Sequence, residues 1–129
     1  MVDAASRGLL KSAHDCSDGG LAVAVAECCV MDREHLMGSV INPSPVTQHP
    51  SLRPDALLFG ESAGRIVVSC EAHRVTALQA LAREHGVPAA VIGRVGGARL
   101  TIGPWIDQPV DVVSETWHSG LLRQLQEPR

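Results

Sequence analysis

The spacing of hydrophobic and polar positions divides the chain into alternating strand-like and helix-like segments. Residues 64–70 contain a continuous apolar run, which is typical of a central strand. Residues 71–86 show instead the spacing of an amphipathic helix that ends at Gly86. The apolar face of this helix consists of Val75, Leu78, Leu81 and Ala82.

The same pattern predicts the other elements. Strands are expected at residues 9–15, 36–41, 88–97 and 98–103, and helices at residues 20–31, 55–61 and about 110–126. A Gly-Gly turn between the last two strands predicts a β-hairpin. The four prolines of residues 42–54 predict a surface loop. The buried stripe of the last helix is expected to be Val110, Val113, Trp117, Leu121 and Leu125.

This order of elements indicates an α/β (α+β) fold, with helices packed on a mixed sheet. The chain has 129 residues, of which 45% are hydrophobic, and this suits one domain spanning residues 1–129. We therefore expect a single core built from aliphatic side chains, because only 2% of the residues are aromatic.

Composition narrows the classes of function. A net charge of −3 and the scarcity of aromatic residues disfavour nucleic-acid binding. No apolar run approaches the roughly 20 residues of a membrane span, and we see no secretory signal. The four cysteines form no C-x-x-C pair, which indicates reduced thiols in a cytoplasmic protein.

A polar segment with two glycines, residues 14–20, stands directly before the helix at 20–31. Its candidate ligand-cleft residues are His14, Asp15, Ser17, Asp18, Gly19 and Gly20. The glycine N–H groups at a helix N-terminus favour anions such as phosphate, but the two aspartates would repel one unless Mg²⁺ or a basic group intervenes. The simpler interpretation is that Ser17 or Asp18 caps the helix.

A second polar cluster, residues 59–65, precedes the most apolar strand. Its candidate residues are Glu61, Ser62 and Arg65. In one interpretation Arg65 contacts a carboxylate or phosphate of a ligand. In the other, Glu61 and Arg65 form an ion pair that closes a turn, and the residues by themselves favour neither.

No metal-binding pattern accompanies these clusters. The six histidines lack metal-ligand spacings such as H-E-x-x-H. Cys16 lies near His14 in sequence, but this spacing gives no convincing Cys–His dyad. We therefore predict no catalytic residue and no metal ligand in this chain.

Three motifs together resemble a known family. They are "SAHDCSDGGLAVAVAECC" at 12–29, "LFGESAGRIVVSC" at 58–70 and "IGRVGGARLTI" at 92–102. In this order they are similar to the C-terminal domain of the phosphoribosylformylglycinamidine synthase family. The resemblance is to the second, C-terminal copy of the aminoimidazole ribonucleotide synthetase-type C-terminal domain in the synthetase subunit of the small form.

The resemblance implies a fold and a reaction. The fold would be a three-layer α/β/α domain, the C-terminal part of a larger synthetase. That enzyme, a ligase, converts formylglycinamide ribonucleotide to its amidine in de novo purine biosynthesis, using ATP, Mg²⁺ and ammonia from glutamine. The implied partners are the N-terminal domains of the same synthetase, a glutaminase subunit and a small accessory subunit, without nucleic acid or membrane, in the cytoplasm.

The resemblance also suggests roles for the two polar clusters. Glu61 and Ser62 would face an interdomain cleft that resembles an auxiliary nucleotide site, and Arg65 would contact the anionic end of a ligand. Residues 14–20 would form the cleft wall. Ala63 departs from the family's usual Gln and removes any side-chain contact there, and Cys16 replaces the usual Val, which suggests a packed position.

The ATP-binding half of such an enzyme has no counterpart in the sequence. Lys11 is the only lysine, and no Gly-rich nucleotide loop is present. We therefore expect the chain to be inactive alone and to bind no cofactor tightly. The alternatives are a free-standing, non-catalytic module that binds a nucleotide or partner, and a domain of a relative such as aminoimidazole ribonucleotide synthetase. An exposed apolar patch would favour a domain that docks onto others.

Overall fold

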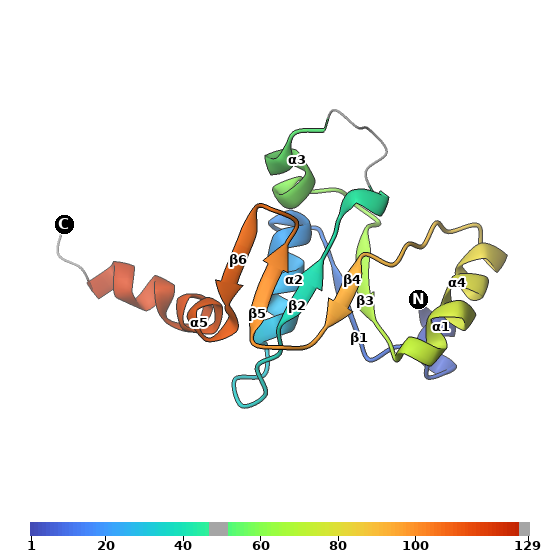
Figure 1. Cartoon of the computed structure of the whole chain (residues 1–129), viewed down its shortest axis with the longest axis horizontal. Helices are drawn as coiled ribbons and strands as arrows, with labels where there is room; N and C mark the ends of the chain where they lie inside the picture. Colours follow the sequence, from blue (N-terminus) through green and yellow to red (C-terminus); the bar gives the residue numbers. More distant parts are fainter. Residues whose placement is uncertain (47–51, 127–129) are drawn as a thin grey trace.

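The computed structural model describes residues 1–46 and 52–126 (Figure 1). The helices are α1 (Val2–Ser6), α2 (Gly20–Val30), α3 (Pro54–Phe59), α4 (Val75–Glu84) and α5 (Val110–Gln126). The strands are β1 (Ser12–Asp15), β2 (Ser39–Ile41), β3 (Ile66–Ser69), β4 (Gly93–Val95), β5 (Arg99–Ile102) and β6 (Ile106–Pro109). Two 3₁₀ turns, Ser44–Val46 and Ala72–Arg74, complete the described elements.

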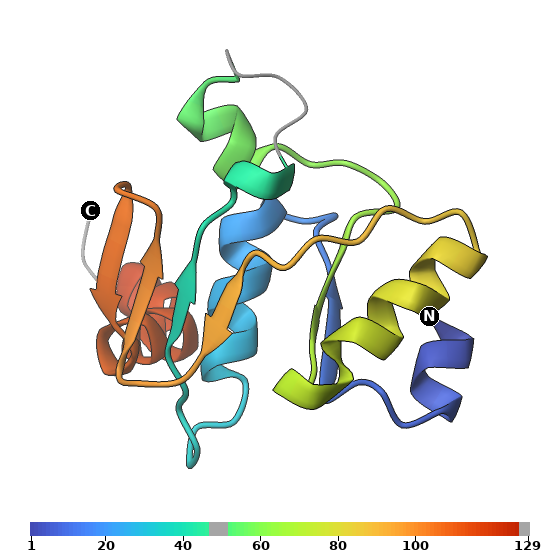
Figure 2. The same cartoon turned by 45° about the vertical axis from the view of Figure 1, so that its right-hand side comes forward.

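The strands form two sheets. One contains β1 and β3 in antiparallel pairing, and the other has the order β4-β2-β5-β6. Within the second sheet β2 and β5 are parallel, whereas the outer pairs are antiparallel (Figure 2). The expected α/β class, with helices packed on a mixed sheet, is thus confirmed.

Helix α2 forms the centre of the core. Its sequence is apolar on most sides, and most of its residues are buried: Gly20, Leu21, Ala22, Ala24, Val25, Cys29 and Val30. It packs against α3, α5 and β1, while Ile102 of β5 is completely buried in the same cluster. The two neighbouring cysteines of α2 differ in exposure, because Cys28 is exposed and Cys29 is buried.

The predicted hairpin between residues 88–97 and 98–103 is wrong, because β2 lies between β4 and β5. The Gly-Gly segment is hydrogen-bonded instead to Gly38. The N–H of Gly38 donates to the carbonyl of Gly97 at 2.8 Å, and the carbonyl of Gly38 accepts from the N–H of Gly96 at 2.7 Å. The alternating pattern identifies strands but not their partners. The hairpin partner of β5 is β6, which the sequence pattern did not reveal.

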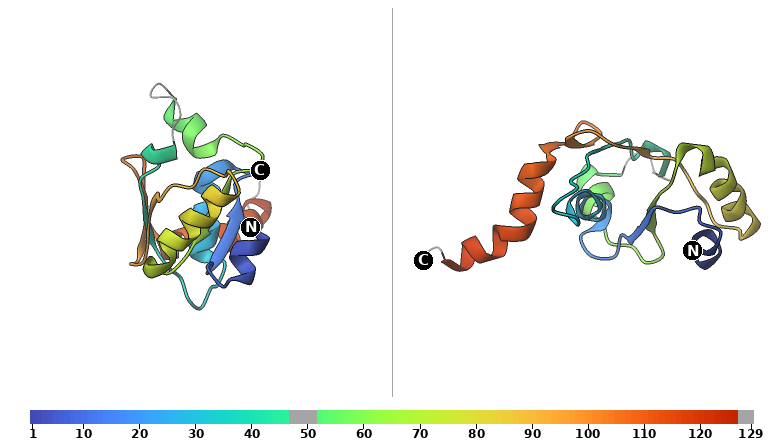
Figure 3. Two further views of the ribbon diagram at one scale, coloured as in Figure 1. Left: turned by 90° about the vertical axis from the view of Figure 1, so that its right-hand side faces the viewer. Right: turned by 90° about the horizontal axis from the view of Figure 1, so that it is seen from below.

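The buried stripe predicted for the last helix is correct only near its start. Val110 is buried and Val113 packs against the core. Further along, Trp117 is 50%, Leu121 73% and Leu125 74% exposed. Helix α5 leaves the body of the domain after its first turns, as the view from below makes clear (Figure 3, right), so its second half has no surface to pack against within the described residues.

The helix predicted at 71–86 is confirmed, as the 3₁₀ turn followed by α4, with Leu81 buried. Gly86 ends it with a φ of 67°, the left-handed conformation that glycine adopts readily. Helix α1, which the sequence pattern did not indicate, is joined to the end of α4 by His85 Nε2 and Asp3 Oδ2, 3.0 Å apart.

The Pro-rich loop predicted at 42–54 lies partly outside the described residues, which omit 47–51. Of its described residues, Asn42, Ser44 and Pro45 are exposed, whereas Pro43 is fully buried. Among the described helices, none combines the length and apolar character needed to cross a membrane.

Candidate functional site

The fold brings the two polar clusters of the sequence together. Asp15 at the end of β1 is the antiparallel partner of Ile66 at the start of β3. The N–H of Cys16 donates to the carbonyl of Arg65 at 2.9 Å, just beyond the paired strands. Residues 14–20 and 60–65 therefore form one surface region, here called the polar junction.

The polar junction is held by a hydrogen bond between its two halves. The N–H of Gly19 donates to Glu61 Oε1 at 3.1 Å. Gly19 is the N-cap of α2, and neither Ser17 nor Asp18 makes a side-chain cap, so that prediction is wrong. Ser17 instead donates its hydroxyl to Asp15 Oδ2 at 2.6 Å. The positive end of the α2 dipole thus receives a carboxylate from a distant part of the chain.

This arrangement changes the phosphate-binding interpretation of the glycines. A free anion at the N-terminus of α2 would compete with the Glu61 carboxylate for the Gly19 N–H. Gly20 has no room for a ligand either, because an added Cβ would lie 2.7 Å from the carbonyl carbon of Phe59. The absence of a side chain at Gly20 thus allows the start of α2 to pack closely against the end of α3.

Arg65 is bound to its own loop and does not pair with Glu61. Its Nη2 donates to the carbonyl of Gly60 at 2.8 Å, and its buried Nε has no hydrogen-bond partner among the described residues. Cys16, which is completely buried as its packed position suggested, lies beside this guanidinium. Burial raises the pKa of the Cys16 thiol and the charge of Arg65 only partly offsets this, so the thiol stays protonated and is a poor nucleophile.

His14 connects β1 to α2 across the edge of the polar junction. Its Nδ1 lies 2.7 Å from the carbonyl oxygen of Asp15, and its Nε2 lies 2.5 Å from Glu27 Oε2. Both contacts favour a doubly protonated ring. The pKa of His14 is raised, first by the Asp15 carbonyl and then, against the opposing effect of burial, by the Glu27 carboxylate. Glu27 was not among the site residues expected from the sequence, although it is the only charged residue of the apolar helix α2.

We expect the His14 contacts to make stability pH-dependent. Because the pKa of His14 in the folded chain exceeds 6.5, its contribution is fully present below pH 6.5 and is lost as the pH rises through the folded value. An NMR titration should show the pKa above 6.5 and should show a decrease towards 6.5 in the Glu27→Gln variant. A His14 pKa at or below 6.5 in the native chain would contradict this prediction.

The remaining candidates lie on the surface of the polar junction. The exposed ones are Asp15, Ser17, Asp18, Glu61 and Ser62. Within residues 1–46 and 52–126, no group of three or more His, Cys, Asp or Glu side chains is arranged to hold a metal ion. Lys11 is paired with Glu71 at 3.0 Å. The described residues therefore offer no preformed cluster that would hold a metal ion by itself.

Removing the Glu61 carboxylate should loosen the polar junction. We expect Glu61→Ala to lower the free energy of unfolding by about 1 kcal/mol, the usual value of a helix N-terminal cap. Asp18→Ala, which removes an exposed carboxylate of the same junction that makes no side-chain cap, should change stability by less than about 0.5 kcal/mol. Urea unfolding of the two variants measures the difference, and equal effects would show that the Gly19–Glu61 bond contributes nothing.

Comparisons with known proteins agree with this fold. Residues 1–103 match the family described as AIR synthase related protein, C-terminal domain. Over 117 residues, 91% of this chain, the sequence is 42% identical to phosphoribosylformylglycinamidine synthase subunit PurL of Thermomicrobium roseum. The subunit of the same name from Anaeromyxobacter sp. (strain Fw109-5) is 41% identical over 92% of this chain. The chain covers only 15% and 16% of these two relatives.

Solved structures are similar in fold. PurL of T. maritima complexed with ATP matches 88% of this chain and 20% of its own length, with a TM-score of 0.75 and 20% identity. The same protein complexed with FGAR matches 88% of this chain with a TM-score of 0.74 and 21% identity. At this level of identity the similarity establishes the architecture, and the ligands named belong to those structures.

Proposed function

The chain belongs to the family of AIR synthase related proteins, C-terminal domain, and on that premise we propose that it is the C-terminal domain of a PurL-type phosphoribosylformylglycinamidine synthase subunit. The observation that carries the proposal is the 42% identity to such a subunit over 91% of the chain. Because the chain covers 15% of that relative's length, the rest of the enzyme would come from other domains.

The proposed enzyme is the ATP-dependent ligase that forms formylglycinamidine ribonucleotide from formylglycinamide ribonucleotide in cytoplasmic purine biosynthesis. ATP and Mg²⁺ would bind mainly to the N-terminal domains, because the residues of this chain do not fit such a site by themselves. A glutaminase subunit would supply ammonia, and a small accessory subunit would complete the complex. A solved neighbour described as the structure of PurLQS from Thermotoga maritima supports assembly with other subunits.

In this proposal the polar junction forms one wall of a cleft between domains. Its exposed side chains, among them Asp18 and Ser62, remain free to contact a neighbouring domain or a ligand held by it. Glu61 and Arg65 would act by positioning, because Glu61 holds the start of α2 and Arg65 holds its own loop. The chain alone is expected to be inactive, since the junction contains no activated nucleophile or metal-ligand group among the described residues.

The distribution of apolar side chains favours a docking domain over a free-standing module. Large apolar residues are exposed in separate regions, including Val95 on β4 at 57%, Phe59 at the end of α3 at 51% and Leu121 on α5 at 73%. On α5, Trp117, Leu121 and Leu125 follow one another at helical spacing and are each at least half exposed, and soluble monomers rarely expose a large contiguous apolar surface. Such surfaces are expected where other domains of the same protein cover them.

The mass of the native polypeptide tests this function. An antibody against the chain should detect a protein several times heavier than 13.6 kDa in the source cells, and that protein should convert formylglycinamide ribonucleotide with Mg-ATP and ammonia. The isolated 129-residue chain should give no turnover in the same assay. A native band at 13.6 kDa would refute the proposal and leave the free-standing binding module as the better interpretation.

A further inference from the structure

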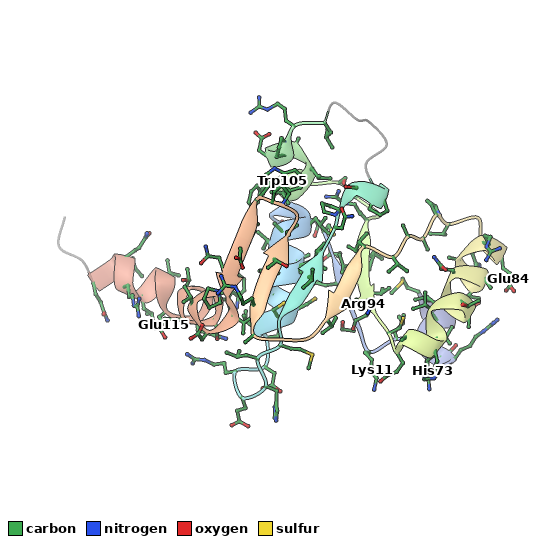
Figure 4. The ribbon with its side chains drawn as sticks, viewed as in Figure 1. Lys11, His73, Glu84, Arg94, Trp105 and Glu115 are labelled. Carbon is green, nitrogen blue, oxygen red and sulfur yellow. The ribbon has the colours of Figure 1, made fainter. Side chains whose placement is uncertain are left out.

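A wide groove separates the two sheets. It has a volume of about 2210 Å³. It is lined by the two edge strands that face each other, β3 and β4, by one side of α2 and by α4. Arg94 of β4 and Lys11 before β1 belong to its opposite sides (Figure 4). Sites for small ligands have volumes of about 300–1,000 Å³, so this groove suits a segment of polypeptide better than a metabolite.

The β4 side of the groove presents unpaired backbone groups. The carbonyl of Ile92 and the N–H of Gly96 are bonded on the side of β2. Because backbone direction alternates along a strand, the N–H and C=O groups of Gly93 and Val95 point away from β2, towards the groove. In the part of the chain that the structure describes, β4 has no strand on that side.

The β3 side presents a matching edge. The carbonyls of Arg65 and Ser69 accept hydrogen bonds from the β1 side. The same alternation directs the backbone groups of Ile66 and Val68 away from β1. β1 and β3 form a sheet of only two strands among the described residues, so β3 has a free edge on the side away from β1.

Apolar side chains are exposed on these edges and on the segment that leads into β4. Val95 of β4 is 57% and Ile66 of β3 is 43% exposed, and Val87 and Val91, between α4 and β4, are each more than half exposed. Proteins usually protect free edges by keeping the strand short or by adding charges and prolines. The three-residue strand β4 carries one charge, Arg94, whereas β3 has neither a charge nor a proline. An apolar edge of this kind is typical of a strand that is covered in the complete protein.

We propose that an extended, apolar segment from the rest of the synthetase polypeptide enters this groove and pairs with β3 on one side and β4 on the other, joining the two sheets into one. The inference rests on the proposed function, because the inserted segment must come from a longer polypeptide. The PurL relative, of which this chain covers only 15%, is such a polypeptide. Strand addition uses backbone hydrogen bonds for affinity and alternate side-chain pockets for specificity, and the groove offers both.

Hydrogen exchange in the complete, native protein tests the inserted strand. The amides of Ile66, Val68, Gly93 and Val95 should all exchange more slowly than exposed amides by a factor on the order of 100 or more. Rapid exchange at both edges, or protection of only one, would overturn the proposal. If either result were obtained with a synthetase that is active and much heavier than 13.6 kDa, the proposed function would still stand. A native mass of 13.6 kDa would refute both the proposed function and the inserted strand.

A pair of matched variants separates insertion from a local effect. Val95→Asp places a charge on the β4 edge and should speed exchange of the Ile66 and Val68 amides on the opposite wall at least tenfold. Val112→Asp, on the exposed surface of α5 outside the groove, should leave those amides protected. Unchanged protection of β5 amides in both variants would confirm that the domain stays folded, and equal exchange of the β3 amides in both variants would contradict the proposal.

Discussion

Gly20→Ala is expected to destabilise the chain by about 2–5 kcal/mol, from a left-handed backbone penalty of about 1–2 kcal/mol together with about 1–3 kcal/mol for overpacking against backbone atoms. Gly20 has a φ of 73°, and a Cβ would lie 2.7 Å from the carbonyl carbon of Phe59 and 2.9 Å from the carbonyl oxygens of Leu58 and Gly60. Backbone cannot move aside as the end of a flexible side chain can, so α2 and α3 would have to separate.

Gly64→Ala is the matched control for this prediction. Gly64 has a similar φ of 79°, but no atom lies within 4 Å of an added Cβ. Its substitution should therefore cost only the backbone penalty, about 1–2 kcal/mol. Urea unfolding of both variants measures the difference between them. If Gly20→Ala cost no more than Gly64→Ala, close contact between α2 and α3 would not constrain this position.

Ile102→Ala should have the second large effect, a loss of about 3–4 kcal/mol in the free energy of unfolding. Ile102 of β5 is completely buried in the core that contains α2, and it is the parallel partner of Ile41 in β2. The substitution removes buried methyl and methylene groups and leaves a cavity that the surrounding elements fill only partly. The measurement is again the unfolding free energy from urea denaturation.

Ile66→Ala provides the comparison at equal chemistry. Ile66 is 43% exposed on β3, so the same truncation should cost less than about 1.5 kcal/mol in the chain alone. If the two isoleucine variants were equally destabilised, the core would not be centred where β5 meets α2. In the complete protein the loss of unfolding free energy caused by Ile66→Ala should be larger, because the groove between β3 and β4 would then be filled by the proposed segment.

Local sequence pattern determined the elements that depend on neighbouring residues. The 3.6-residue spacing of residues 71–86 located α4, and the apolar run of residues 64–70 located β3. Motifs around Gly19, Glu61 and Gly97 were sufficient to indicate the family that the comparison of residues 1–103 confirmed. Each of these signals is contained in a short stretch, and side-chain periodicity and turn chemistry are local properties.

Only the tertiary structure decided which distant residues meet. Spacing along the chain could not show that Glu61, rather than Ser17 or Asp18, serves the start of α2, or that β2 separates β4 from β5. Backbone hydrogen bonds are alike in every strand, so sequence pattern does not identify their partners. The sequence pattern also could not predict that Leu121 is exposed. An apolar stripe shows which side of a helix can be buried, but the fold determines whether another surface lies against that side.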